Sequence, residues 1–514
     1  MNTRGGKVMN GFFLKTIYMV LNILLAFFMM PFILHTLGDK MYGMWILLGT
    51  ILSYIAYLDM GISSAVSRFI SRAVGRQDMN EINEVSNTSF VVYLFIGIAS
   101  LFVTLILVLL VGLWIKSPDD LKVARILLSI LGLNMAIGFP IRAFGSILEA
   151  NLRYEISESI MLVELLLRNL LIFIFFSTGC RIIALGMIII GTSFVSYALY
   201  LFFAFRTYKG LRLDLNFFNR NKIKEIFSYS VYAFLNRLAG ILISRIDALV
   251  ITIFISLSAV AHYSIAAVTV AYLSNFIVNA NNLIGPVISQ DEGRGDIDGI
   301  RRKFLIATKF FAYITLFVGT MVILYGCPFI IRWVGVRYED AYPVLLVLAP
   351  CTVIALIQAP SNSVLLSISK HKYLPLLAFT EGILNLLLSI VLVKRYGIVG
   401  VALGTAIPMC LMRFFIQPIY VCGILKISKK NYYFDAIGKP IFISMIGILP
   451  IFYLVAPYVS PSYKTLFICS IIQFIIYFSF VLAIGLNKTE KNYIFGRLVK
   501  RVKSMPLFLS IVRA

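Results

Sequence analysis

SYSVYAFLNRLAGILISRIDALVITIFIS, residues Ser228–Ser256, is the stretch from which the fold class is best argued. It is long and apolar enough to cross a bilayer, which takes roughly 20 residues at about 1.5 Å rise each. Yet Arg237, Arg245 and Asp247 lie within it. A charge at bilayer depth costs about 2.5–3.5 kcal/mol, so each of these side chains is expected to face protein or water.

Helical geometry places these three charges on one half of the helix. At about 100° per residue, Arg245 lies roughly 80° to one side of Arg237 and Asp247 roughly 80° to the other. Arg245 and Asp247 therefore point apart and are not expected to neutralise each other. Two interpretations stay open. Either this face lines a polar cavity in which a cation meets an anionic ligand, or each charge pairs with a neighbouring helix and only stabilises the bundle.

The composition indicates an all-α integral membrane protein. The chain has 514 residues, of which 60% are hydrophobic and 13% charged, and its mean hydropathy is +0.93. Ordinary soluble domains contain about 25% charged residues. Fourteen apolar segments are expected to form transmembrane helices, near residues 12–36, 41–66, 86–114, 126–149, 156–177, 182–205, 228–256, 258–289, 304–331, 341–368, 373–393, 398–424, 438–458 and 464–486. A tight turn is expected near Ser256–Ser258.

The basic residues predict the orientation. With an even number of helices, both termini lie on the same side of the membrane. Lys and Arg concentrate at the amino terminus, in the even-numbered connections and in the tail after residue 487. The positive-inside rule therefore places both termini in the cytoplasm. It also accounts for the net charge of +23 without a nucleic-acid partner.

A short repeat predicts two related halves. VGRQDMNEIN (Val74–Asn83) and EGRGDIDGIR (Glu292–Arg301) follow the second and eighth expected helices. Six helices separate the copies, so both run in the same direction. This arrangement predicts two parallel six-helix lobes with a substrate site between them. The expected divisions are a lobe at 1–205, a cytoplasmic linker at 206–227, a lobe at 228–424, two further helices at 425–486 and a basic tail at 487–514.

Further charges lie at membrane depth. In LDMG (Leu58–Gly61), Asp59 either binds a coupling ion or caps a second helical segment after a break that the glycine permits. Glu164 and Arg168 are spaced to pair within one helix. Lys309 lies near a helix end, where it can extend to the interface. The remaining candidates are Arg142, Glu149, Glu381, which is spaced to meet Asn385, and Arg413.

Several function classes are disfavoured. No GxxxxGK[ST] motif is present, so ATP is not expected to drive the protein. The six cysteines form no CxxC and the three histidines are far apart, so we expect no metal site and no cofactor. The loops are too short for a soluble catalytic domain, and we expect no enzyme.

Three segments carry a family resemblance. LGDKMYGMWILLGTILSYIAYLDMGISSAVSRFISRAVGRQD (Leu37–Asp78), FPIRAFGSILEANLRYE (Phe139–Glu155) and RYGIVGVALGTAI (Arg395–Ile407) resemble polysaccharide flippases of the Wzx type. That family belongs to the superfamily that includes the MATE drug exporters and the lipid II flippase. The resemblance implies two six-helix lobes around a central cavity, followed by two extra helices.

The resemblance also implies a function. A polyprenyl-diphosphate-linked oligosaccharide, such as an O-antigen, capsule or exopolysaccharide repeat unit, would be flipped across the bacterial inner membrane by alternating access. Cationic residues would hold the diphosphate, and an H⁺ or Na⁺ gradient would reset the cycle. A glycan polymerase or export machinery is a possible partner. The diphosphate candidates are Arg237, Arg245, Arg142 and Arg413, and the ion-coupling candidates are Asp59, Asp247 and Glu381.

Two other functions stay open. A proton- or sodium-coupled exporter of small molecules with the same fold would use Asp59, Asp247 and Glu381 as its principal residues. The basic residues at depth argue against cationic substrates. A glycan polymerase or ligase is less well supported, because such enzymes need a larger outer loop.

Overall fold

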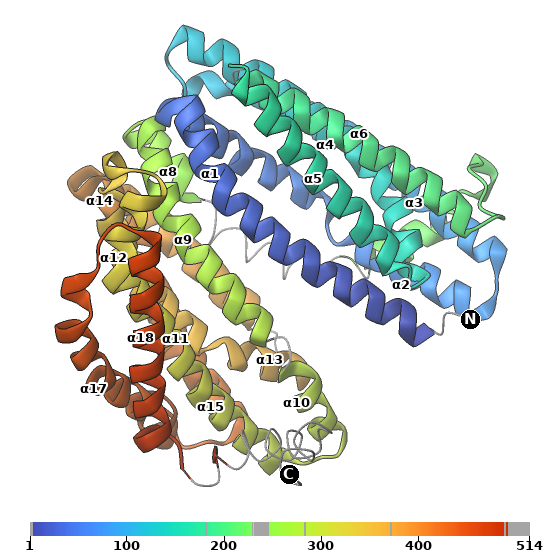
Figure 1. Cartoon of the computed structure of the whole chain (residues 1–514). Helices are drawn as coiled ribbons and strands as arrows, with labels where there is room; N and C mark the ends of the chain where they lie inside the picture. Colours follow the sequence, from blue (N-terminus) through green and yellow to red (C-terminus); the bar gives the residue numbers. More distant parts are fainter. Residues whose placement is uncertain are drawn as a thin grey trace, which may run out of the picture. The chain divides into compact units, whose positions relative to one another are not determined.

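The computed structural model describes residues 4–179, 182–228, 230, 246–281, 284–370, 373–487 and 490–491. Every regular element in those ranges is helical (Figure 1). The predicted all-α class is therefore confirmed. The chain divides into two compact units, Met1–Ser264 (unit 1) and Ile265–Ala514 (unit 2), with the division inside α9 (Leu257–Asn281). The division into lobes and linker expected from the sequence stays a prediction.

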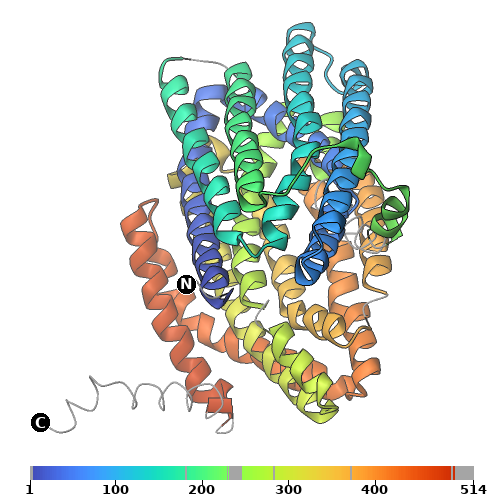
Figure 2. The ribbon, with the colours of Figure 1, turned by 90° about the vertical axis from the view of Figure 1, so that its right-hand side faces the viewer.

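Unit 1 is a bundle of long helices that run side by side (Figures 1 and 2). Its helices are α1 (Arg4–Ala56), α2 (Ile62–Arg76), α3 (Met79–Leu110), α4 (Pro118–Ala150), α5 (Tyr154–Ser177), α6 (Ile182–Thr207) and α8 (Ile246–Phe254). Short 3-10 turns lie at η1 (Tyr57–Asp59), η2 (Val111–Leu113) and η3 (Leu215–Phe217).

The helix α4 is central to the packing of unit 1. It contacts α2, α3, α5 and α6, and its contact with α3 is the most extensive. Gly97 of α3 makes this close approach possible, since a Cβ atom there would lie 2.5 Å from the carbonyl oxygen of Ala136. Phe139 and Phe144 of α4 are fully or almost fully buried in the core beside Tyr93 of α3.

Unit 2 continues from α9 with α10 (Ile284–Gly293), α11 (Ile297–Trp333), α12 (Ala341–Ile357), α13 (Ala359–Ser367), α14 (Leu374–Cys410), α15 (Gln417–Leu425), α16 (Lys429–Asn431), α17 (Lys439–Leu454) and α18 (Tyr463–Phe480). Its 3-10 turns are η4 (Val336–Tyr338) and η7 (Ala456–Tyr458), and its π-helical turns are η5 (Leu411–Ile416), η6 (Tyr432–Gly438) and η8 (Val481–Gly485).

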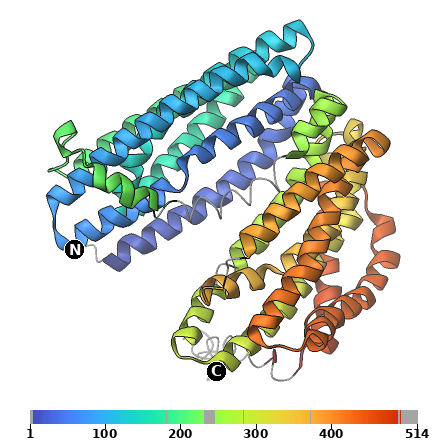
Figure 3. The ribbon, with the colours of Figure 1, turned by 180° about the vertical axis from the view of Figure 1, so that it is seen from behind.

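The helix α11 organises unit 2. It packs against α12, α13, α17 and α18, and Figures 1 and 3 show α17 beside α18 in the red part of the chain. Where α11 meets the π-helical turn η6, the rings of Phe304 and Tyr432 stack with centroids 5.5 Å apart. Both rings are fully buried, which joins α11 to the helices that follow α15.

The described residues contain eleven helical stretches long and apolar enough to cross a membrane. Two of them, Phe13–Arg76 with 64 residues and Leu374–Leu425 with 52, are too long for one crossing of a hydrocarbon core of about 30 Å. Each contains a glycine with non-helical backbone angles, Gly38 and Gly397, so each holds more than one crossing. Part of Ser228–Ser256 lies outside the described residues, so the total of fourteen stays a prediction.

The sequence repeat is also a repeat of backbone geometry. Gln77 and Gly295 both adopt left-handed φ angles, of 58° and 70°. The residues that follow them, Asp78 and Asp296, both cap the next helix. Each carboxylate accepts a hydrogen bond from the backbone N–H three residues later, at 2.9 and 2.8 Å. The two segments thus end one helix and start the next in the same way.

Two further pairs of turns follow the same pattern. Leu152 and Ser369 each have φ of 57°, and Gly179 and Gly397 have φ of 85° and 58°. All three pairs have the same separation along the chain to within one residue. A left-handed residue of non-glycine type is uncommon, so its recurrence at this spacing indicates a duplicated helix arrangement.

Replacing Gly97 by Ala is expected to destabilise the protein by about 1–3 kcal/mol, because the added methyl group meets a backbone carbonyl that cannot rotate away. The thermal unfolding midpoint in detergent measures this effect. Gly191→Ala on α6 is the matched control, since no atom lies within 4 Å of its added Cβ. Equal midpoints for the two variants would contradict the assigned packing.

Candidate functional site

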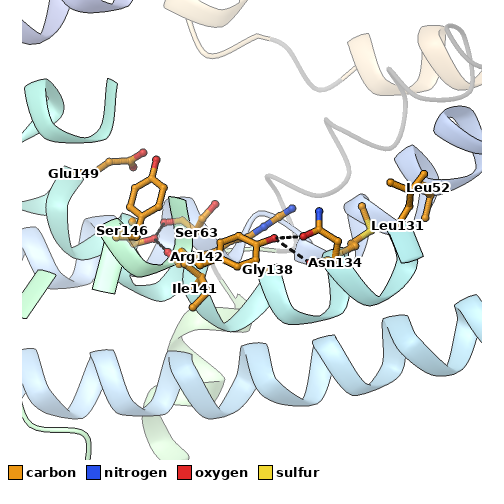
Figure 4. Close-up of a pocket in the computed structure, with 13 residues that line it drawn as sticks. Leu52, Ser63, Leu131, Asn134, Gly138, Ile141, Arg142, Ser146 and Glu149 are labelled. Carbon is orange, nitrogen blue, oxygen red and sulfur yellow. Dashed lines mark hydrogen bonds between the residues drawn. The ribbon is translucent and has the colours of Figure 1, made fainter. Parts of the chain in front are cut away.

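A pocket of about 480 Å³ follows one face of α4 inside unit 1. Figure 4 shows the labelled residues of α4 along this helix from Leu131 to Glu149, together with Leu52 of α1 and Ser63 of α2. The α4 residues recur at intervals of three or four, which places them on one helix face. The lining consists of Leu52, Ser63, Leu131, Asn134, Met135, Gly138, Ile141, Arg142, Gly145, Ser146, Glu149, Tyr197 and Tyr200.

A buried carboxylate lies beside this pocket. The chain leaves helical geometry between α1 and α2, where Met60 and Gly61 both adopt left-handed conformations. Asp59 precedes them and is only 2% exposed. Its Oδ1 accepts a hydrogen bond from the hydroxyl of Tyr93 at 2.7 Å, and its Oδ2 accepts one from Ser63 at 3.4 Å. The break predicted around Gly61 is confirmed, and the carboxylate is held by side chains rather than by the helix start.

Arg142 joins this carboxylate to the pocket. Its guanidinium lies 3.3 Å from Asp59 Oδ1 and over the ring of Phe139, 4.7 Å from the centroid. Its side chain is 37% exposed, whereas Asp59 is buried. The guanidinium thus uses one side to neutralise a buried acid and presents its remaining donors to the pocket. A guanidinium has five N–H donors, so both contacts can be made at once.

Uncharged polar groups continue along the pocket. The hydroxyl of Tyr197 donates to Asn134, at 3.0 Å to its carbonyl and 3.2 Å to its side-chain oxygen, and the Asn134 amide donates to Ser193. Glu149, toward the other end of α4, is exposed. The pocket therefore offers a cation near its middle, hydrogen-bonding groups on one side and a carboxylate on the other. The guanidinium can bind an anionic group and the uncharged polar groups can bind hydroxyls, whereas the carboxylate of Glu149 would repel an anion at that end.

A second acid–arginine pair is buried in unit 2. Glu381 of α14 is 2% exposed, and its Oε2 lies 3.1 Å from Nε of Arg413 in η5. Arg413 also donates to the Gln417 side chain at 2.9 Å, and Gln417 donates to Asn362 at 2.9 Å. Glu381 and Arg413, assigned different roles from the sequence, are therefore partners in one polar network.

The remaining sequence candidates belong to the predicted helix at Ser228–Ser256. Asp247 lies at the start of α8, and its Oδ2 accepts a hydrogen bond from the Tyr263 hydroxyl at 2.6 Å. Arg237 and Arg245 lie outside the described residues. Whether they line a cavity stays a prediction.

Two expectations about structural charges have different outcomes. Arg168 pairs with Glu164 on the same helix at 3.9 Å, as the spacing predicts. Whether Lys309 extends toward the interface, as its place near a helix end allows, stays a prediction. Its side chain is 11% exposed and its Nζ binds both carboxylate oxygens of Glu490, at 3.0 and 2.8 Å. A partner far along the chain holds it, which a single helix cannot reveal.

Sequence reasoning missed the uncharged members of the site. Tyr93, Asn134 and Tyr197 carry no charge, so a search for charges at membrane depth passes over them. The available signal was weak: Asn134 and Arg142 lie on one face of their helix. Within the described ranges, no three His, Cys, Asp or Glu side chains gather into a potential metal site.

A family model described as "Polysaccharide biosynthesis protein" matches residues 8–291, which is more than half of the chain. The chain belongs to this family. The match covers all of the residues that line the pocket and the Asp59–Arg142 pair. The family resemblance seen in the sequence is thus confirmed, and the chain is a multi-pass membrane protein.

A curated protein and two solved structures are also similar to this chain. "Uncharacterized membrane protein EpsK" of Bacillus subtilis (strain 168) is 23% identical over 431 residues, which cover 82% of this chain and 84% of that protein. The structure of lipid II flippase MurJ in an inward closed conformation has a TM-score of 0.71 at 16% identity and covers 94% of this chain and 99% of that chain. An inward-facing MATE family multidrug resistance transporter has a TM-score of 0.69 at 16% identity, covering 79% and 96%. The two structures establish a shared fold.

Replacing Arg142 by Ala is expected to destabilise the protein by about 1–3 kcal/mol, because it removes a cation that lies 3.3 Å from the buried Asp59 carboxylate. The double variant Asp59→Asn/Arg142→Ala should recover most of that loss, since a neutral amide needs no counter-charge. A double-mutant cycle of unfolding midpoints tests this coupling. Strictly additive effects would show that the two side chains do not stabilise each other.

Proposed function

We propose that this protein flips a polyprenyl-diphosphate-linked oligosaccharide from the cytoplasmic to the outer leaflet of a bacterial inner membrane, with both termini in the cytoplasm. The repeat unit of an O-antigen, capsule or exopolysaccharide is the cargo class. Membership of the polysaccharide biosynthesis family and the shared fold with a lipid II flippase support this proposal.

The observation that carries the proposal is the half-exposed guanidinium of Arg142 in the pocket. A guanidinium binds phosphate oxygens through two parallel hydrogen bonds. Asp59 pairs with Arg142 and is itself fixed by the hydrogen bond from Tyr93, so the orientation of the guanidinium is set before the ligand arrives. Asn134, Tyr197 and the adjoining serines supply hydrogen-bonding groups of the kind that sugar hydroxyls require.

The remaining arginines extend the same chemistry. Arg237 and Arg245 are the candidates contributed by the helix that follows the linker, and Arg413 is the candidate in unit 2. Arg413 can reach the substrate only if its ion pair with Glu381 breaks. We therefore propose that it binds the diphosphate only in a conformation in which that pair is open. In alternating access, the diphosphate binds these cations from the cytoplasmic side and is released when the opposite side opens, while the lipid tail stays in the bilayer.

The energy source is proposed to be an H⁺ or Na⁺ gradient, with Asp59, Asp247 and Glu381 as the candidate acids. In this conformation arginines neutralise both Asp59 and Glu381. A coupling cation at either acid must therefore displace a guanidinium, which links ion binding to release of the arginine. A glycan polymerase or export complex is the partner that would receive the flipped unit.

The alternative is an ion-coupled exporter of small molecules. The MATE transporter fold is compatible with it. The pocket in unit 1 argues against cationic drugs as substrates, because the charge directed into its middle is the guanidinium of Arg142. Drug sensitivity of cells that lack the protein separates the two functions, since loss of a flippase should remove surface glycan without increasing drug sensitivity.

Replacing Arg142 by Ala is expected to reduce flipping about 10- to 100-fold, the loss that corresponds to a charge-assisted hydrogen bond of about 1.5–3 kcal/mol. The measurement uses cells that lack the native protein and express the variant. Lipid-linked oligosaccharides are extracted, and the fraction in the cytoplasmic leaflet is determined. Complete repeat units should accumulate there while surface polymer disappears.

Arg168→Ala is the matched control, because Arg168 is an intramembrane arginine that lines no part of this pocket. Membrane levels of both variants are measured by immunoblot. Normal surface glycan with Arg142→Ala would remove this arginine from the binding site. A normal leaflet distribution in cells without any copy of the protein would overturn the flippase proposal itself.

A further inference from the structure

Residues 206–224, which begin at the last two residues of α6, form a strap along the amino-terminal turns of α3. Figures 1 and 3 show it in green beside that end of α3. Residues 208–219 of the strap are irregular apart from the turn η3, and residues 220–224 are helical. The backbone of the irregular part is extensively hydrogen-bonded to side chains of α3. These bonds determine which side of the strap faces outward.

Two asparagines one helical turn apart bind the strap as a neighbouring β-strand would. The Asn83 amide donates to the Gly210 carbonyl at 3.0 Å, and its oxygen accepts from the Arg212 N–H at 3.0 Å. The Asn87 amide donates to the Arg212 carbonyl at 2.7 Å, and its oxygen accepts from the Asp214 N–H at 3.0 Å. Both asparagines are buried, with 4% exposure. This asparagine clamp fixes residues 210–214 in an extended conformation.

The clamp continues toward the next helix. The Asn219 N–H donates to the Thr88 hydroxyl at 3.0 Å, and Lys222 Nζ binds Glu81 Oε1 at 3.0 Å. Burial of Lys222 opposes its charged form, but the hydrogen bonds and charges of Glu81 and Glu225 outweigh this and raise its pKa. The strap is therefore held at both ends of its course along α3.

The position of the clamp along α3 sets its depth. The uninterrupted apolar part of this helix begins at Phe90 and continues to Leu110. Roughly 20 residues at about 1.5 Å each match the hydrocarbon core of about 30 Å. Asn83, Asn87 and Thr88 come immediately before that part. The strap therefore lies at the level of the lipid headgroups.

The side of the strap that faces away from the clamp is both apolar and cationic. Leu213, Leu215 and Phe218 are 46%, 78% and 40% exposed. Exposed basic side chains flank them, and none has an ion-pair partner among the described residues: Arg206, Lys209, Arg212, Arg220 and Lys224.

We infer that this clamped strap is a docking surface for the anionic lipid headgroups of the adjoining leaflet. The three apolar side chains enter the interface, where their exposure to water ends, and the five cations meet lipid phosphates. An acidic protein would satisfy the cations but would leave three apolar side chains at headgroup depth unexplained. This inference stands independently of the cargo.

The test places a bimane fluorophore on Leu215→Cys in full-length protein whose native cysteines are replaced by alanine. The protein is reconstituted in nanodiscs that contain brominated phosphatidylcholine, alone or mixed with phosphatidylglycerol. Quenching by the brominated lipid should be at least about fivefold greater in the anionic mixture, the factor that corresponds to the contribution of about 1 kcal/mol from a single Lys or Arg near an anionic surface. Replacing all five cations by Gln should abolish the difference.

Two controls keep the result interpretable. The same fluorophore at Leu113→Cys, exposed at the opposite end of the α3 region, should respond equally in both lipids and in the five-Gln variant. Salt at about 1 M shortens the screening length to about 3 Å and should reproduce the loss in protein with its native charges. Quenching at residue 215 that is equal in both lipids, or unchanged by salt, overturns the inference and favours an acidic protein partner.

Discussion

A carboxylate inside an apolar helix bundle has to be neutralised, and this requirement shapes both units of the protein. An unpaired charge at that depth is costly, so an acid in such a place needs a cation or a proton. Asp59 and Glu381 are both almost completely buried and both have an arginine. In unit 1 this pairing orients Arg142 near the middle of a pocket. In unit 2 it connects α14 with η5 and, through Gln417, with α13.

The same pairing explains how the guanidinium of Arg142 can be preorganised for binding before a ligand is present. Asp59, fixed by Tyr93, pairs with the guanidinium, and the ring of Phe139 lies beneath it. The side chain therefore loses little rotational freedom when an anion binds, which leaves more of the interaction energy for affinity. An arginine of the same length on an unpartnered helix face would have to be ordered by the ligand itself.

Local features were predictable from the sequence, whereas partners across helices were not. The break after Asp59 and the Glu164–Arg168 pair depend on residues within one turn, so spacing reveals them. The choice of Arg142 as partner of Asp59 depends on which helices pack together. The fold class and the repeat were also predictable, because hydropathy and the GRQD and GRGD segments are properties of the chain itself.

The charged residues that remain ambiguous in sequence are those whose partners are distant. Glu381 is spaced to meet Asn385, yet its close ionic contact is Arg413 in a different helical segment. Lys309 is a second case, because its ion-pair partner, Glu490, lies far along the chain. Asparagines such as Asn83 attract no attention in a search for charges, although their amides can bind an extended backbone on both its donor and acceptor sides.

Neutralisation of each buried acid within its own unit has an electrical consequence. The membrane potential is worth about 2.3 kcal/mol per elementary charge per 100 mV, but it acts on net charge displaced across the field. The charges of Asp59 and Arg142 sum to zero, and so do those of Glu381 and Arg413. The first pair lies within unit 1 and the second within unit 2. A rearrangement of the units that keeps these pairs intact moves no net charge on their account. Any voltage dependence of the transport cycle must then come from the cargo, from a coupling ion or from other charged residues.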